Sequence, residues 1–198
     1  MVERPPRPLR TATLAALVVG AFASLLVALS LYPEARYALT PRDPVELGSF
    51  AKAELGGAVE GRYVRAEVQL AGQPGLGFHR IGEGERRLVR TAPSEPRRDT
   101  APRFVEHAVP AGAGARFLPP RIVAGRLSRV GELGLRHRGL ARPLEGLVPE
   151  ASSRGWVIVD GEAPRSAAWV MGVEAMVFGF FVWNVVSLAR ILKRRPAA

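Results

Sequence analysis

The side chains best suited to chemistry are three histidines and one pair of acids. His79 and His107 lie in segments with strand-like alternation, and His137 lies between two arginines. Metal sites need several convergent ligands, and no His-x-x-His or carboxylate–His metal spacing occurs. We therefore expect solvated or hydrogen-bonded histidines, with no metal and no cofactor. The segment Asp160-Gly161-Glu162 follows an apolar run, and we expect it to form a turn.

Other catalytic signatures are also missing from the sequence. The chain contains no cysteine, which excludes a disulfide, a thiol nucleophile and a Cys-ligated zinc. No Gly-x-Ser-x-Gly elbow occurs, so nothing indicates a nucleophilic serine. The glycine-rich segment 72–84 lacks the Lys-Ser/Thr pair of a phosphate-binding loop. The sequence therefore predicts a protein that is not an enzyme.

A set of arginines is the best candidate for contact with a partner. Basic side chains attract anionic proteins or lipid headgroups, although a solvated basic face is the alternative. The residues that we predict to contact a partner from this set are Arg86, Arg87, Arg97 and Arg98.

Two polar residues interrupt an apolar run near the C-terminus. Glu174 lies five residues after Trp169, and an acid at such a depth tends to face protein or water rather than lipid. It either reaches outward to Arg165 or contacts a partner helix. Asn184 is a second candidate, for an interhelical hydrogen bond. We include Glu174 and Asn184 among the predicted partner contacts.

Two apolar runs must position these residues, one at 11–32 and the other at 167–189. Each is about the ~20 residues that a helix needs to cross a bilayer core of roughly 30 Å. A cleaved signal peptide is the alternative for the first run, but the run is longer than the usual signal core. We predict two transmembrane helices.

The flanking charges predict the orientation of these helices. The formal net charge is +10, and the tails at 1–10 and 190–198 are short and basic. Such flanks stay in the cytoplasm, whereas long loops cross the membrane largely regardless of their charge. We expect both termini in the cytoplasm and segment 33–166 in the periplasm of a bacterial inner membrane. Because much of the charge flanks the spans, nucleic-acid binding is not expected.

The segment between the spans is predicted to be rich in short strands. Asp43-Pro44-Val45-Glu46 resembles a capped helix start, so a helix is expected near 44–55. Alternating apolar residues then predict strands. These strands are expected at 62–70, 76–81, 87–90, 103–109, 121–130 and 155–160. The spacing favours a small antiparallel barrel or sandwich, similar to an oligonucleotide-binding (OB) fold.

Two short segments and the layout carry a family resemblance. Val123-Ala124-Gly125-Arg126-Leu127 resembles a V-x-G-x-L strand, and the second segment is Gly155-Trp156-Val157-Ile158-Val159-Asp160. With a helix on each side of a β domain, the chain resembles the surfeit-locus family of cytochrome oxidase assembly factors. It lacks that family's Gly-x-Trp-Gln opening, and Pro164-Arg165-Ser166 replaces its His-containing segment before the last helix.

The sequence thus predicts two transmembrane helices flanking one small extracytoplasmic β domain. The expected function is a membrane-anchored, non-enzymatic scaffold or assembly factor that docks on an envelope or respiratory membrane protein. The expected partners are the lipid bilayer and another integral membrane or envelope protein. A membrane-bound sensory or ligand-binding module, for lipid headgroups or another anion, is the alternative.

Overall fold

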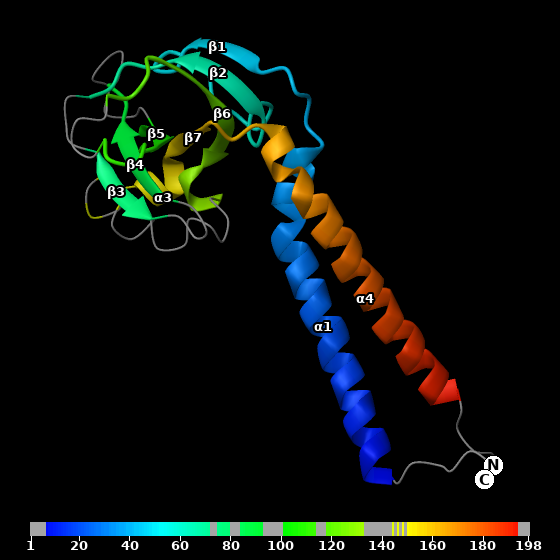
Figure 1. The fold of residues 1–198 in the computed structure, drawn as a ribbon. Coiled ribbons are helices and arrows are strands. Elements are labelled where there is room, and N and C mark those ends of the chain that lie inside the picture. Colours follow the sequence, from blue (N-terminus) through cyan, green and yellow to red (C-terminus); the bar gives the residue numbers. More distant parts are fainter. Residues whose placement is uncertain are drawn as a thin grey trace. The chain divides into compact units, whose positions relative to one another are not determined.

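Along the chain, one long helix precedes a run of short strands and a second long helix follows it (Figure 1). The computed structural model describes residues 7–71, 75–79, 84–92, 101–113, 118–132, 144, 146, 148 and 150–193. The helices α1 (Arg7–Ala38) and α4 (Ala168–Lys193) coincide with the two apolar runs. Both are long and apolar enough to cross a membrane. The chain forms two compact units, a helical unit (Met1–Ala35 with Ala168–Ala198) and a β domain (Arg36–Ala167).

The β domain contains one seven-stranded sheet. Its strands are β1 (Val45–Ser49), β2 (Tyr63–Glu67), β3 (Leu76–His79), β4 (Glu85–Arg90), β5 (Arg103–Ala108), β6 (Ile122–Arg129) and β7 (Trp156–Asp160). The short helices of the domain are η2 (Val130–Glu132), α3 (Ala151–Arg154) and η4 (Pro164–Ala167). The strand order is β1-β2-β6-β7-β5-β4-β3. This order ends at β1 and β3, so closure into a barrel stays a prediction.

The sheet is mixed, and the expectation of an antiparallel sheet is wrong. β1 runs parallel to β2, and β5 runs parallel to β7. β6 lies between β2 and β7 and is antiparallel to both. The parallel pairs join strands that are separated by long connections, as parallel pairing requires. Local alternation in the sequence cannot reveal such pairing.

The helix predicted near 44–55 is also wrong, because this segment begins with β1. Val45 and Leu47 are half-buried against the core, while Glu46 and Gly48 are exposed. This period of two fits a strand that covers one face of the sheet. Gly48, with φ of 63°, follows an irregularity in the pairing with β2. The tertiary contacts therefore override the capping pattern.

Apolar clusters lie on both faces of the central strands. One contains Phe50, Val64, Ala66, Val68, Val105, Val123, Leu127, Trp156 and Ile158. The other contains Leu88, Phe104, Val130, Leu144, Ala151 and Val157. β7 is buried from Trp156 to Val159, and β5 from Phe104 to His107. Charged side chains on these strands are consequently buried as well.

Gly125 allows β6 to approach β7 closely. A Cβ at this position would lie 1.9 Å from the Val159 carbonyl oxygen. Val159 belongs to the ladder that pairs β6 with β7, so its backbone cannot withdraw without breaking that ladder. This contact explains why glycine occupies the centre of the Val123–Leu127 segment.

Candidate functional site

A buried histidine and an aspartate connect two central strands of the β domain. His107 Nδ1 on β5 lies 2.9 Å from Asp160 Oδ2 on β7. The His107 side chain is 1% exposed and that of Asp160 is 25% exposed. The Ala124 backbone N–H donates to the other carboxylate oxygen, Asp160 Oδ1, at 3.4 Å. Asp160 therefore joins β7 to both neighbouring strands, β5 and β6.

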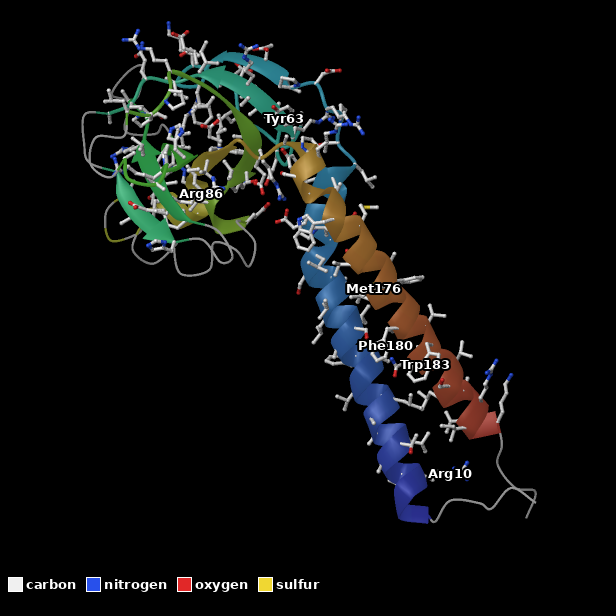
Figure 2. All side chains as sticks on the ribbon, in the orientation of Figure 1. Arg10, Tyr63, Arg86, Met176, Phe180 and Trp183 are labelled. Atoms are coloured by element: carbon white, nitrogen blue, oxygen red, sulfur yellow. The ribbon has the colours of Figure 1, made fainter. Side chains whose placement is uncertain are left out.

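The opposite face of β5 carries a second charged pair. Neighbouring residues of a strand point to opposite faces, so Glu106 lies on the other side of the sheet from His107. Arg86 Nε on β4 lies 3.7 Å from Glu106 Oε1, and the Glu106 side chain is fully buried. Arg86, labelled in Figure 2, is itself 13% exposed. The predicted partner contact at Arg86 is thus engaged within the domain.

The His107–Asp160 pair has the geometry of an oriented base, in which a carboxylate fixes the imidazole tautomer. A catalytic imidazole must also reach its substrate, and the burial of His107 places its ring inside the sheet. The pair is therefore suited to joining β5 and β7. Among the described residues, no group of three or more His, Cys, Asp or Glu side chains is arranged to hold a metal ion.

Arg103 fastens the segment after β1 to the start of β5. Its guanidinium donates through NH1 to the Phe50 carbonyl and through NH2 to the Ala53 carbonyl, the latter at 2.9 Å. It also lies 5.5 Å from the centre of the Phe50 ring. Burial lowers the pKa of Arg103 from its usual value, and the two carbonyl acceptors compensate part of the lost hydration.

Two carboxyl groups, those of Glu60 and Glu132, lie close enough to share a hydrogen bond. A hydrogen bond with the Glu60 side chain raises the pKa of Glu132, and desolvation and the charge of Glu60 act in the same direction. Arg129 opposes this shift, and its Nε lies 3.4 Å from Glu60 Oε2. The Arg129 guanidinium also stacks over the Trp156 ring at 4.8 Å. The Glu132 carboxyl is therefore easier to protonate than that of an isolated glutamate.

Tyr37 joins both ends of the β domain. Its hydroxyl donates to the backbone carbonyl of Glu162, and the Arg126 guanidinium of β6 lies 4.7 Å from its ring centre. Tyr37 is buried, as is Glu162. The first and last segments of the domain are therefore held side by side.

The helical unit is an antiparallel pair with a heptad-like seam. Arg10 NH2, near the start of α1 (Figure 2), donates to the Ile191 carbonyl at 3.0 Å. Buried and half-buried residues recur in alternating steps of four and three along both helices, which is the spacing of coiled coils. They are Leu14, Leu17, Ala21, Ser24, Ala28, Leu31 and Ala35 on α1, and Val170, Glu174, Val177, Phe181, Asn184, Leu188 and Ile191 on α4.

Both polar residues predicted on α4 lie in this seam. Asn184 is buried, its Nδ2 donates to the Phe180 carbonyl at 2.7 Å, and its Oδ1 approaches the position that a Cβ on Gly20 would occupy. Glu174 is half-buried, and within the described part of the chain its Oε2 atom has no hydrogen-bond partner. Asn184 thus packs between the helices, while Glu174 keeps an unused acceptor.

The remaining predicted residues are spread over the chain. Arg87 on β4 is half-buried and lies opposite His107 in the β4–β5 register. His79 on β3 is exposed. Arg97, Arg98 and His137 lie outside the described residues. The sequence-predicted residues are therefore not gathered into one site.

The His107–Asp160 pair was missed by the sequence reasoning because its members are 53 residues apart. One local feature of the sequence could have indicated a buried polar contact. Glu106 and His107 are consecutive polar residues within an apolar strand, so their side chains must face opposite buried sides of the sheet.

Comparison of the chain with protein-family models, with curated proteins and with solved structures gives no match.

Proposed function

We propose that this chain is a membrane-anchored scaffold or assembly factor without enzymatic activity. Its β domain lies on the periplasmic side of a bacterial inner membrane and docks on another integral membrane or envelope protein. The helices hold this domain next to the bilayer and so confine its search for a partner to the membrane surface. The observation that carries the proposal is a β domain bounded in sequence by two helices long enough to span a membrane.

The charges at the helix ends support this orientation. The contact between Arg10 and the Ile191 carbonyl brings the start of α1 beside the end of α4. Arg190 and Lys193 are in the last turn of α4. Short basic flanks are retained in the cytoplasm, so both ends of the pair belong there. The β domain, which connects the opposite ends of the helices, then belongs on the other side.

The two ends of the sheet support a docking role. Within the described residues, β1 pairs with β2 alone and β3 pairs with β4 alone. The outer edge of such a strand carries backbone N–H and C=O groups that accept an added strand. A partner that supplies an extended segment would gain main-chain hydrogen bonds along β1 or β3.

Glu174 supports a second contact, within the membrane. A carboxyl group on a membrane helix is costly unless it finds a hydrogen-bonding or charged partner. Oε2 of Glu174 is enclosed and has no hydrogen-bond partner among the described residues, so a partner helix would supply a donor only by packing directly over this position. The layout of the chain also resembles that of the surfeit-locus assembly factors, and this resemblance supports an assembly role.

The experiment that tests the docking role is photo-crosslinking from the sheet edges in native membranes. A photoreactive amino acid replaces exposed Glu46 on β1 or exposed His79 on β3, with exposed Arg154 on α3 as the control position. We expect one discrete membrane-protein adduct from an edge position and none from the control. A solitary monomer on purification in mild detergent, together with no edge-specific adduct, would contradict the proposal.

A further inference from the structure

Each end of the β domain presents an arginine one helical turn from an exposed aromatic residue. On α1, Tyr32 is 60% exposed, and Arg36 follows it at i+4 and is also exposed. Before α4, exposed Arg165 precedes Trp169 by the same spacing, and Trp169 is 55% exposed. Leu39, at i+3 from Arg36, is 73% exposed. The two ends therefore repeat one pattern in opposite chain directions.

One hydrogen bond inside the β domain joins the two segments that carry these arginines. Arg36 precedes Tyr37, whose hydroxyl donates to the Glu162 carbonyl, and Arg165 lies three residues after Glu162. Local bonds order both segments: Thr40 Oγ1 donates to the Tyr37 carbonyl at 2.7 Å, and Ser166 Oγ donates to the Ala163 carbonyl at 2.6 Å. The arginine backbones are thus positioned before any ligand binds.

The nearby acids do not neutralise this pair of arginines. Glu162 is buried, Glu34 is half-buried and engaged in contacts of its own, and neither forms an ion pair with Arg36 or Arg165 in the described residues. Two exposed guanidinium groups consequently remain where the chain passes between the apolar helices and the polar domain.

The spacing matches the layers of a membrane surface. Tyr and Trp rings favour the interface between hydrocarbon and headgroups. Four residues of an α-helix span about 6 Å, and the 3₁₀ turn that holds Arg165 rises slightly more per residue. Both arginines are then expected at about the depth of the headgroup phosphates. Guanidinium groups bind phosphate oxygens in a bidentate manner, and exposed Leu39 adds apolar surface next to Arg36.

We propose that Arg36 and Arg165 together bind the phosphate of an anionic phospholipid headgroup. The site is independent of any protein partner, so it goes beyond the scaffold function and does not require it. Its ligand class is a glycerophospholipid with net negative charge, in the leaflet on the side of the β domain.

The test uses the full chain in nanodiscs that contain phosphatidylcholine and a minority of phosphatidylglycerol. Native mass spectrometry after release of the disc counts the phosphatidylglycerol molecules retained by the protein. We expect Arg36→Gln/Arg165→Gln to weaken this retention about tenfold, and Arg36→Lys/Arg165→Lys to restore part of it, because charge remains but the bidentate geometry is lost.

The matched control is Arg65→Gln/Arg154→Gln, which removes the same charge from two surface ion pairs of the β domain. All variants keep the basic residues at the other ends of the helices, so lipid bound there contributes equally to every measurement. We expect the control to retain phosphatidylglycerol like the parent chain. Unchanged retention in the Arg36/Arg165 variant, an equal loss in the control, or displacement of the lipid by millimolar inorganic phosphate would each overturn the proposal.

Discussion

The β domain and the helical unit place their polar groups according to opposite rules. The domain buries charged side chains in pairs, such as Arg86 with Glu106, while apolar side chains fill both faces of its sheet. The helices expose large apolar side chains to their surroundings, including Met176, Phe180 and Trp183 (Figure 2), and keep Asn184 between them.

The difference is the one expected if the domain lies in water and the helices lie in lipid. Water drives apolar surface into the core of the domain, and a charge that goes with it needs a partner. Lipid provides no such drive between helices, which associate through close packing and hydrogen bonds of small and polar residues. The seam residues Ser24 and Asn184, with Gly20 next to both, have this composition. The four substitutions below test the comparison, from the largest expected effect to the smallest.

Gly125→Ala should unfold the β domain or severely reduce its stability, while leaving the helical unit intact. The new Cβ would overlap the Val159 carbonyl, so the β6–β7 ladder must separate, at a cost of about 4 kcal/mol or more. Denaturant unfolding of the full chain in detergent, followed by the circular dichroism of the strands, measures the loss. The control is Gly84→Ala, where a Cβ meets nothing within 4 Å; equal stability of the two variants would refute the explanation.

Arg86→Met tests whether this arginine serves the domain or a partner. Removing it leaves the Glu106 carboxylate buried without this cation, which should destabilise the domain by about 3 kcal/mol. Thermal unfolding measures the effect, with exposed Arg90→Met on the same strand as the control. A stable Arg86→Met protein that fails to bind its partner would restore the interpretation of Arg86 as a docking residue.

Gly20→Ala should loosen the helical pair without affecting the β domain. Its Cβ would lie 3.0 Å from Asn184 Oδ1, so the amide must move and part of the interhelical packing is lost. We expect a cost of about 1 kcal/mol, measured as a shift in the SDS concentration that separates the helices. Gly172→Ala, where a Cβ has open space, should leave this midpoint unchanged.

Glu132→Gln should remove a small dependence of domain stability on pH. The hydrogen bond with Glu60 raises the pKa of Glu132 in the folded state. Protonation therefore favours folding: the contribution is complete below the ordinary value of 4.5 and disappears as the pH rises through the raised folded-state pKa.

Because Glu132 is exposed, we expect a difference of a few tenths of a kcal/mol. Unfolding midpoints between pH 4 and pH 8 measure it, with Glu150→Gln as the control. A parent chain that gains stability from Glu132 as the pH rises would contradict the sign.

The sequence predicted those elements whose signals are local. The long apolar runs located α1 and α4, and alternation or a short apolar run located six of the seven strands. The strand β1 was missed because Pro44 and Glu46 satisfy a capping pattern, whereas its extended form depends on packing against the cluster that contains Phe50. Parallel pairing and the His107–Asp160 contact depend on residues far apart in the chain, and no local pattern encodes them.

The most direct test locates the β domain relative to the termini. The chain has no cysteine, so single introduced thiols report their own side of the membrane. We expect exposed Ser153→Cys in the β domain to react with an impermeant maleimide in intact cells whose outer membrane is permeable, and Lys193→Cys to react only after the inner membrane is opened. Labelling of Lys193→Cys from outside with protection of Ser153→Cys would contradict the proposed topology.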